Sequence, residues 1–279
     1  MTIEQARRYF AEEIRAVAHL ESEALVEAFA RVPREAFLGA GPWQIARSPD
    51  PPMYRTTVDD DPRHLCHNVL VAIDPARQLH NGLPSALAQW IEAAGVRPGD
   101  RVLHIGAGVG YYTAIFAELV GPAGAVVGHE VDPALAARAR AALGPWSMAR
   151  VDTGDAAAPD GPFDAIFVNA GCTHPRPAWL AALAPGGRLI IPLTIRVPGA
   201  PAGVGRMLRA ERRDPRWPAH FVSSVGMYDC SNARDPTHED ELRSLVGPVP
   251  SARPTAVLVE PHDRSDTCLA HLPGFCLQA

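Results

Sequence analysis

The chain has 279 residues, of which 47% are hydrophobic, and its formal net charge is −5. This length and composition support a sizeable core, and no basic run marks a surface for nucleic acid. The five cysteines are odd in number and lack C-x-x-C spacing, which favours a reduced, cytoplasmic protein. No apolar run is long enough to predict a membrane span, and the charged first residues do not resemble a signal peptide.

The first part of the chain is predicted to be helical and then irregular. Apolar residues with helical spacing predict two helices within residues 2–30, with a break near residues 19–22. Residues 40–65 are rich in proline, aspartate and arginine, so we expect an irregular loop there. The apolar run 69–73 predicts a short strand.

From residue 84 onwards strand and helix patterns alternate, which indicates an α/β fold with a doubly wound parallel sheet. Strands are expected over residues 101–105, 125–130, 149–152, 165–169 and 188–193, and helices over 85–94, 112–120, 133–143 and 177–183. Later residues predict two antiparallel edge strands, a short helix and one last apolar run, at 207–212, 220–227, 239–245 and 256–260. We therefore expect a helical and substrate-side segment at 1–80, a core at 81–235 and an extension at 236–279.

A glycine-rich turn follows the strand predicted at 101–105. Gly106, Gly108 and Gly110 allow positive φ angles and a close approach of the backbone to a ligand at a helix N-terminus. A dinucleotide fingerprint has the spacing G-x-G-x-x-G, whereas here the third glycine arrives one residue early. The spacing G-x-G-x-G is typical of S-adenosylmethionine sites, because that cofactor has no pyrophosphate to hold.

Two acids follow at the ends of the next two strands. We expect Glu130 to accept hydrogen bonds from the two ribose hydroxyls, and Asp155 to accept one from the adenine amino group. The full set expected to bind S-adenosylmethionine is Leu79, Gly82, Ile105, Gly106, Ala107, Gly108, Gly110, Tyr111, Glu130, Val131, Asp155, Ala156 and Asn169.

With these residues in view, the chain resembles the protein-L-isoaspartate O-methyltransferases over about residues 30–235. Residues 32–37 read VPREAF, which is similar to that family's V-P-R-x-x-F. Residues 106–114, GAGVGYYTA, resemble its glycine loop and the start of the following helix. Residues 161–166 and 183–192 resemble its A-P-F-D-x-I strand entry and its L-x-P-G-G-R-L…P hairpin. The resemblance implies a Rossmann-like class I methyltransferase that transfers a methyl group from S-adenosylmethionine to a carboxylate.

The chain departs from the family pattern in three places. His104 stands where the family usually has an acid, and Gly82 stands where it has a serine that helps to seat the isoaspartyl carboxylate. The terminal segments are also longer than in compact members. We expect His80, Asn81 and Ser85 to provide the acceptor side instead. A carboxylate on a modified, biosynthetic peptide fits these departures better than general repair of proteins.

Two other functions stay open at this point. A small-metabolite O- or N-methyltransferase would need a general base, for which His80 and His174 are candidates. A binding protein that keeps the fold and has lost catalysis is the other alternative. The residues asparagine-alanine-glycine-cysteine at 169–172 do not match the Asn/Asp-Pro-Pro-aromatic turn of base methylation, and neither nucleic acid nor a membrane is an expected partner. The sequence does not indicate an oligomeric state.

Residues 64–67, histidine-leucine-cysteine-histidine, bring three potential metal ligands together. We see no second cluster with ligand spacing elsewhere in the chain, and a structural zinc site needs four ligands. We therefore expect no metal.

Overall fold

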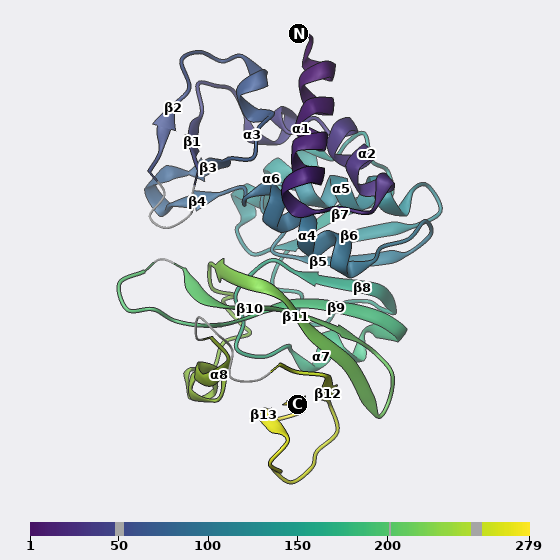
Figure 1. The fold of residues 1–279 in the computed structure, drawn as a ribbon. Coiled ribbons are helices and arrows are strands. Elements are labelled where there is room, and N and C mark those ends of the chain that lie inside the picture. The colour runs from purple at the N-terminus through teal and green to yellow at the C-terminus, as the bar shows by residue number, and fades with distance from the viewer. Residues whose placement is uncertain (48–52, 201, 247–252) are drawn as a thin grey trace. The chain divides into compact units, whose positions relative to one another are not determined.

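The computed structural model describes residues 1–47, 53–200, 202–246 and 253–279. The chain divides into two compact units (Figure 1). The first unit holds residues 1–92, 96–99 and 107–153, and the second holds 93–95, 100–106 and 154–279. The boundary falls inside the glycine loop, between Gly106 and Ala107. The segment bounds expected from the sequence stay a prediction.

The first unit begins with helices whose apolar faces pack together. They are α1 (Ile3–Ala18), α2 (Glu23–Arg31) and the single turn α3 (Glu35–Leu38). Thr2 and Gln5 form a capping box at the start of α1, and a left-handed His19 ends it, which explains the predicted break. Phe10 of α1 meets Phe29 of α2 edge-to-face at 6.1 Å, and the two helices lie side by side (Figure 1).

A small antiparallel sheet follows in the first unit. Its strands β1 (Gln44–Ala46), β2 (Arg55–Thr56), β3 (Leu70–Asp74) and β4 (Leu79–His80) have the order β2-β1-β3-β4. The expectation of an irregular loop over residues 40–65 was therefore wrong in part. Ile45 pairs with both Arg55 and Val71, so strand pairing that is distant in sequence orders a segment with little periodicity of its own.

The remainder of the first unit contains helices and parallel strands close to their predicted bounds. They are most of α4 (Pro84–Ala94), α5 (Tyr111–Val120), β6 (Ala125–Glu130), α6 (Pro133–Ala142) and β7 (Ala149–Thr153). Asp132 caps α6 by accepting from two backbone N–H groups. Strands β6 and β7 are parallel and in register, with Glu130 opposite Thr153. Glu130 thus stands at the carboxyl end of a strand, where α/β folds place their ligands.

The second unit is a mixed sheet with the strand order β13-β14-β12-β11-β10-β9-β8-β5. Strands β5, β8 and β9 run parallel to one another, and β10 and β11 continue the sheet as antiparallel strands. The antiparallel direction of β10 and β11 is as expected, but their expected edge position was wrong, because β12, β14 and β13 extend the sheet beyond β11. The bounds are β5 (Arg101–Ile105), β8 (Phe163–Val168), α7 (Pro177–Ala181), β9 (Leu183–Ile195), β10 (Gly203–Glu211), β11 (Arg216–Met227), α8 (Glu239–Val246) and β12 (Ala256–Leu258).

Two details of the second unit differ from the expectation. The motif at 183–192 lies in the long strand β9, which forms a hairpin with β10 and begins five residues before the predicted strand, because Gly186 and Gly187 exchange backbone hydrogen bonds with Arg212. Two further strands, β13 (Cys268–Leu272) and β14 (Phe275–Gln278), follow the last apolar run. Both are short and contain polar residues, so the sequence pattern did not reveal them. No helix in the described part of the chain is long and apolar enough to cross a membrane.

Candidate functional site

The glycine loop leads into α5 within the first unit. The Gly110 N–H donates to the carbonyl of Ala107 at 2.9 Å, and the Ala107 N–H donates to the carbonyl of His129 at 3.0 Å. Gly110 has a φ of +90°, and a Cβ there would approach the backbone of Ala139 to 3.2 Å, so any other residue would be strained. Nothing lies within 4 Å of the position that a Cβ would take at Gly108. The loop is therefore fixed by its own backbone and leaves open space at Gly108.

Glu130 is tied to this loop by two backbone hydrogen bonds. One carboxylate oxygen accepts from the Gly108 N–H at 2.7 Å, and the other accepts from the Asp132 N–H at 3.0 Å. The residue is 7% exposed, and each oxygen keeps capacity for another donor. The neighbouring Val131 is 53% exposed, which is unusual for a large apolar side chain. The end of β6 thus presents a fixed carboxylate beside an exposed apolar surface.

In the second unit, Ile105 and Gly106 end β5 beside the end of β8. The Asn169 N–H donates to the Ile105 carbonyl at 2.7 Å, and the Asn169 side chain lies 3.5 Å from the Gly106 carbonyl. A Cβ at Gly106 would stand 2.9 Å from the Asn169 carbonyl oxygen. This close approach explains why the first glycine of the motif is needed, independently of any ligand.

Asp155 and Ala156 follow in the same unit. The Asp155 carboxylate pairs with Arg176 at 3.0 Å, and hydrogen bonding to Asn232 and Arg176 lowers the pKa of Asp155. Trp179 donates its indole N–H to the Ala156 carbonyl at 2.9 Å and so holds that left-handed residue in place. An anionic Asp155 is suited to accept from an amino group, and its adenine role stays a prediction.

Tyr111 is fully buried, so its side chain belongs to the core of the first unit. Its ring lies edge-on to Phe29 at 6.4 Å and to Phe37 at 5.7 Å. The guanidinium of Arg34 lies 5.9 Å from the Tyr111 ring centroid. A cofactor contact from Tyr111 would have to come from its backbone.

Arg34, in the VPREAF motif, has a structural task that the sequence did not reveal. The residue is 2% exposed, and its guanidinium donates to the carbonyls of Leu65 and His67 at 3.2 Å and of Val69 at 2.8 Å. We name residues 65–69 the acceptor-side loop. One buried side chain thereby fixes the path of this loop into β3.

The expected acceptor residues lie together directly after this small sheet. His80 pairs with Ala72 of β3, and the Asn81 N–H donates to the Val71 carbonyl at 2.8 Å. Gly82 has a φ of +73°, and a Cβ there would lie 2.8 Å from a Leu87 methyl group. A serine at this position would be strained in this backbone.

Two amide side chains supply polar groups beside Gly82. Asn68 in the acceptor-side loop forms two bonds with Ser85, one from its Nδ2 to the hydroxyl and one from the Ser85 N–H to its Oδ1, both at 3.0 Å. The Ser85 hydroxyl accepts in this pair, so its own proton can be donated. Asn81 is 7% exposed, and its Nδ2 has no partner among the described residues. Asn68 was not identified from the sequence, because this clamp spans 17 residues.

His80 is poorly suited to act as a general base. Burial lowers its pKa to about 4, and its Nδ1 accepts the Gly82 N–H at 3.1 Å. Near neutral pH the ring is uncharged, and the Nδ1 lone pair is committed to the turn. His174, the other candidate base, lies in the second unit, where its Nδ1 is 2.9 Å from the Thr173 hydroxyl and 3.2 Å from His238. Burial lowers the pKa of His174 as well.

His104 makes an acid-stability prediction. Complete burial lowers its pKa to about 3, so the unfolded chain binds a proton at His104 between about pH 6.5 and pH 3 and the folded chain does not. The free energy of unfolding is therefore highest above about pH 6.5 and decreases as the pH falls, because protonation of His104 stabilises the unfolded chain alone. We expect His104→Leu to flatten the pH dependence of unfolding free energy by up to about 1.4 kcal/mol per pH unit. Urea denaturation at pH 7 and pH 4.5 measures the unfolding free energy of both proteins. An equal change of this free energy between the two pH values in wild type and His104→Leu would contradict the prediction.

The histidine-cysteine-histidine run at 64–67 does not converge on one point. His64 pairs with Asp59 at 2.7 Å, the His67 carbonyl serves Arg34, and burial raises the pKa of the Cys66 thiol to about 11. These three residues belong to the packing of the acceptor-side loop.

Comparison with known proteins shows the family of the chain. The family model for protein-L-isoaspartate(D-aspartate) O-methyltransferase matches residues 70–198. A protein-L-isoaspartate O-methyltransferase of Ignicoccus hospitalis is 32% identical over 197 residues, covering 68% of this chain and 83% of the relative. One from Rhodopseudomonas palustris is 31% identical over 240 residues and covers 84% and 83%.

Solved structures show the same fold. A protein-L-isoaspartate O-methyltransferase matches with a TM-score of 0.66 at 21% identity, over 85% of this chain and 69% of the other. A Plasmodium falciparum protein described as a putative member, in complex with S-adenosyl-L-homocysteine, gives 0.60 at 16% identity, over 81% and 98%. The fold is thus the Rossmann-like class I methyltransferase fold, as the resemblance implied and in agreement with the α/β pattern of the sequence. The chain belongs to the protein-L-isoaspartate O-methyltransferase family of S-adenosylmethionine-dependent enzymes.

Proposed function

We propose that this protein transfers the methyl group of S-adenosylmethionine to an aspartyl or isoaspartyl carboxylate of a peptide or protein. The methyl carbon–sulfur bond breaks as a carboxylate oxygen forms the new carbon–oxygen bond, and S-adenosylhomocysteine and a methyl ester result. A carboxylate is already a nucleophile at neutral pH, so no proton has to be removed. The observation that carries the proposal is the acceptor segment 80–85, which holds hydrogen-bond donors and a histidine whose Nδ1 lone pair is committed.

On the cofactor side, the proposal rests on the end of β6. Glu130 is buried, oriented by two backbone N–H groups and close to the open space at Gly108. This arrangement suits a ribose diol, and the exposed Val131 suits the flat face of the nucleoside. The roles of Ile105, Asp155, Ala156 and Asn169 remain predictions from the sequence.

On the acceptor side, Asn81 and Ser85 supply N–H and O–H donors for a carboxylate. The amide of Asn81 and the hydroxyl of Ser85 carry no negative charge, so they can orient the anion. Positioning and exclusion of water then supply the catalysis. We expect Asn81→Ala and Ser85→Ala to raise the KM for the acceptor while the affinity for S-adenosylmethionine stays unchanged in calorimetry.

The decisive experiment supplies radiolabelled S-adenosylmethionine with three matched peptides that contain isoaspartate, aspartate or asparagine. Label that is incorporated into the isoaspartyl or aspartyl peptide and released as methanol in mild base supports a carboxylate ester. Label that resists base would instead identify an ether or N-methyl product, as a metabolite-type enzyme makes. Cofactor binding without transfer to any acceptor would indicate a binding protein.

A modified biosynthetic peptide is a second acceptor, favoured by Gly82. The family places a serine at this point, but the φ of +73° and the 2.8 Å approach to Leu87 oppose it here. We expect Gly82→Ser to lower the unfolding free energy by roughly 1–3 kcal/mol without creating activity on isoaspartyl peptide. Thermal melting measures the stability of Gly82→Ser, and the peptide assay measures its activity on isoaspartyl peptide. A stable variant with raised activity would contradict the preference for a modified peptide. We also propose the cytoplasmic location predicted from the sequence, which rests on the odd number and spacing of the cysteines.

A further inference from the structure

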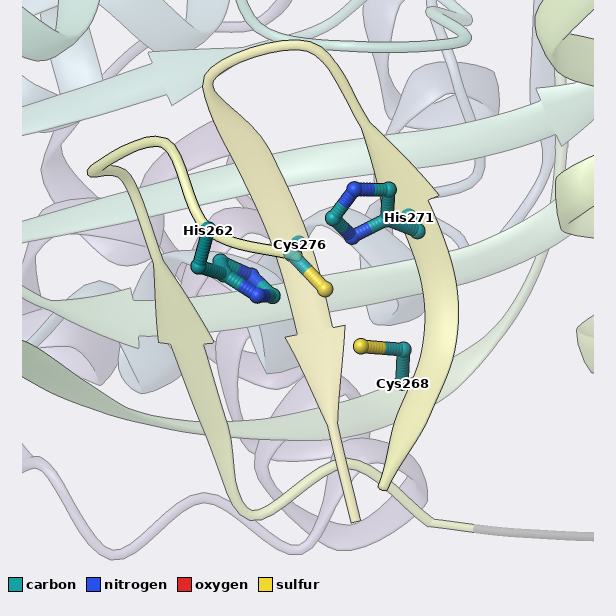
Figure 2. Close-up of side chains that lie close together, drawn as sticks. All are labelled: His262, Cys268, His271 and Cys276. Atoms are coloured by element: carbon teal, nitrogen blue, oxygen red, sulfur yellow. The ribbon is translucent and has the colours of Figure 1, made fainter. Parts of the chain in front are cut away.

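We propose that the last three strands of the second unit hold a structural zinc ion through His262, Cys268, His271 and Cys276. One ligand atom from each lies within 4.8 Å of all the others. Figure 2 shows the side chains pointing toward one another from the loop after β12, from β13 and from β14. This inference is independent of the proposed methyl transfer, and it departs from the expectation that the chain binds no metal.

The strand pairing explains how the sequence brings these ligands to one face. His271 and Cys276 are directly opposite each other on β13 and β14. Cys268 would face the other side by simple alternation, but the register shifts between Cys268 and Ala270. Such a bulge re-aims a side chain. His262 completes the group from the loop that joins β12 to β13.

The two histidine rings are prepared as ligands. The Nδ1 of His262 lies 2.8 Å from the carbonyl of Asp263, so Nδ1–H donates and Nε2 keeps its lone pair. The Nε2 of His262 and the Nδ1 of His271 are buried without a partner among the described residues. The His271 backbone N–H donates to Glu241 at 2.9 Å, which anchors that strand position on α8. Buried nitrogens without partners are uncommon and call for an explanation.

Hydrogen-bond donors point at both sulfurs. The side-chain N–H₂ of Gln278 lies 2.9 Å from the Cys276 sulfur and 3.3 Å from the Cys268 sulfur, and the Ser265 N–H lies 3.2 Å from the Cys268 sulfur. Gln278 is 3% exposed, and Thr267 holds its oxygen at 2.7 Å. Donors aimed at sulfur are the second shell expected around metal-bound thiolates.

The ligand set selects the metal and its role. Two imidazoles and two thiolates are a zinc set, and four protein ligands close the shell, which is typical of a structural site. A tetrahedron with bonds of about 2.0–2.1 Å to nitrogen and about 2.3 Å to sulfur has edges of roughly 3.3–3.8 Å. Movements of about 1 Å from the present arrangement therefore complete it. Binding releases two thiol protons to solvent, and the two thiolates neutralise the Zn²⁺ charge.

The first test measures the zinc content of the purified full-length protein by mass spectrometry after incubation with Zn²⁺ and a thiol reductant. We expect about one zinc per chain in the wild type and in the control Cys66→Ser, and less than about a tenth in Cys268→Ser/Cys276→Ser. Equal zinc in the wild type and the double variant, or none in the wild type, would overturn the site. A Cys268–Cys276 disulfide in the protein purified without reductant would also overturn it.

A second variant distinguishes loss of a ligand from misfolding of the strands. His262 lies in a loop outside any strand, so His262→Ala leaves the β13–β14 pairing in place while it removes one ligand. We expect its zinc affinity to fall on the order of 100-fold or more. Cobalt replaces zinc in such sites, and the wild type should show the visible absorption of a tetrahedral S₂N₂ centre and near-ultraviolet thiolate charge transfer. An octahedral cobalt spectrum, or one that His262→Ala leaves unchanged, would refute the assignment.

Discussion

Glu130→Ala is expected to raise the dissociation constant for S-adenosylmethionine about 100-fold, since two charge-assisted hydrogen bonds to the ribose would be lost. In the protein, the same carboxylate accepts from the N–H groups of Gly108 and Asp132. The substitution therefore removes both the proposed contact with the ribose and a support of the loop. Isothermal titration calorimetry with S-adenosylmethionine and with S-adenosylhomocysteine measures the effect.

Asp152→Ala provides the matched control for Glu130. Asp152 is an acid on the neighbouring strand β7, opposite His129. Its side chain is 46% exposed, and Arg150 is its one ion-pair partner among the described residues. We expect it to leave cofactor affinity within about a factor of two, because exposed pairs contribute little. Glu130→Gln keeps one oxygen and should fall between wild type and alanine. Wild-type affinity in Glu130→Ala would show that the ribose assignment is wrong.

Arg34→Ala should lower the unfolding free energy by at least about 3 kcal/mol, since three carbonyls of the acceptor-side loop lose a charged donor. For a chain of this size that corresponds to a melting temperature lower by roughly 6 °C or more. Calorimetry or thermal circular dichroism measures the change. Loss of the loop should also displace Asn68 and so weaken acceptor binding through Ser85.

Two controls separate geometry from charge. Arg31→Ala removes a 66% exposed arginine whose nearest carboxylate contacts are 3.8 Å long, and it should change stability by less than about 0.5 kcal/mol. Arg34→Lys keeps the charge, but an ammonium cannot reproduce the planar fork that reaches three carbonyls. We expect it to recover little of the loss, and full recovery would show that charge alone matters.

Much of the α/β core could be predicted from sequence periodicity, because its strands are continuous apolar runs separated by amphipathic helices. Both bounds of β5, α5 and β6 lie within one residue of the predicted ones. In the small sheet, β3 was predicted from its apolar run within one residue, but β1, β2 and β4 could not be, since they are two or three residues long and depend on pairing with other strands. Strand β14 contains Cys276 and Gln278, whose polar groups hide its burial.

The residues of the candidate site also fall into those that local sequence patterns predict and those that depend on distant contacts. Glycine spacing and the acid at the end of β6 are local patterns, so Gly108 and Glu130 were found from the sequence. Arg34 and Asn68 act through hydrogen bonds to residues 17–35 positions away, which leave no periodic trace. The zinc ligands escaped notice because a turn and a register shift bring them together.

The clamp made by Arg34 has an evolutionary consequence. It binds backbone carbonyls, which every amino acid possesses, and not the side chains of Leu65, His67 and Val69. The exposed His67 and the half-buried Val69 can therefore change between descendants while the clamp keeps the loop in place. Selection could alter the proposed preference for an acceptor by substituting at these two positions, without first having to rebuild the scaffold that holds them.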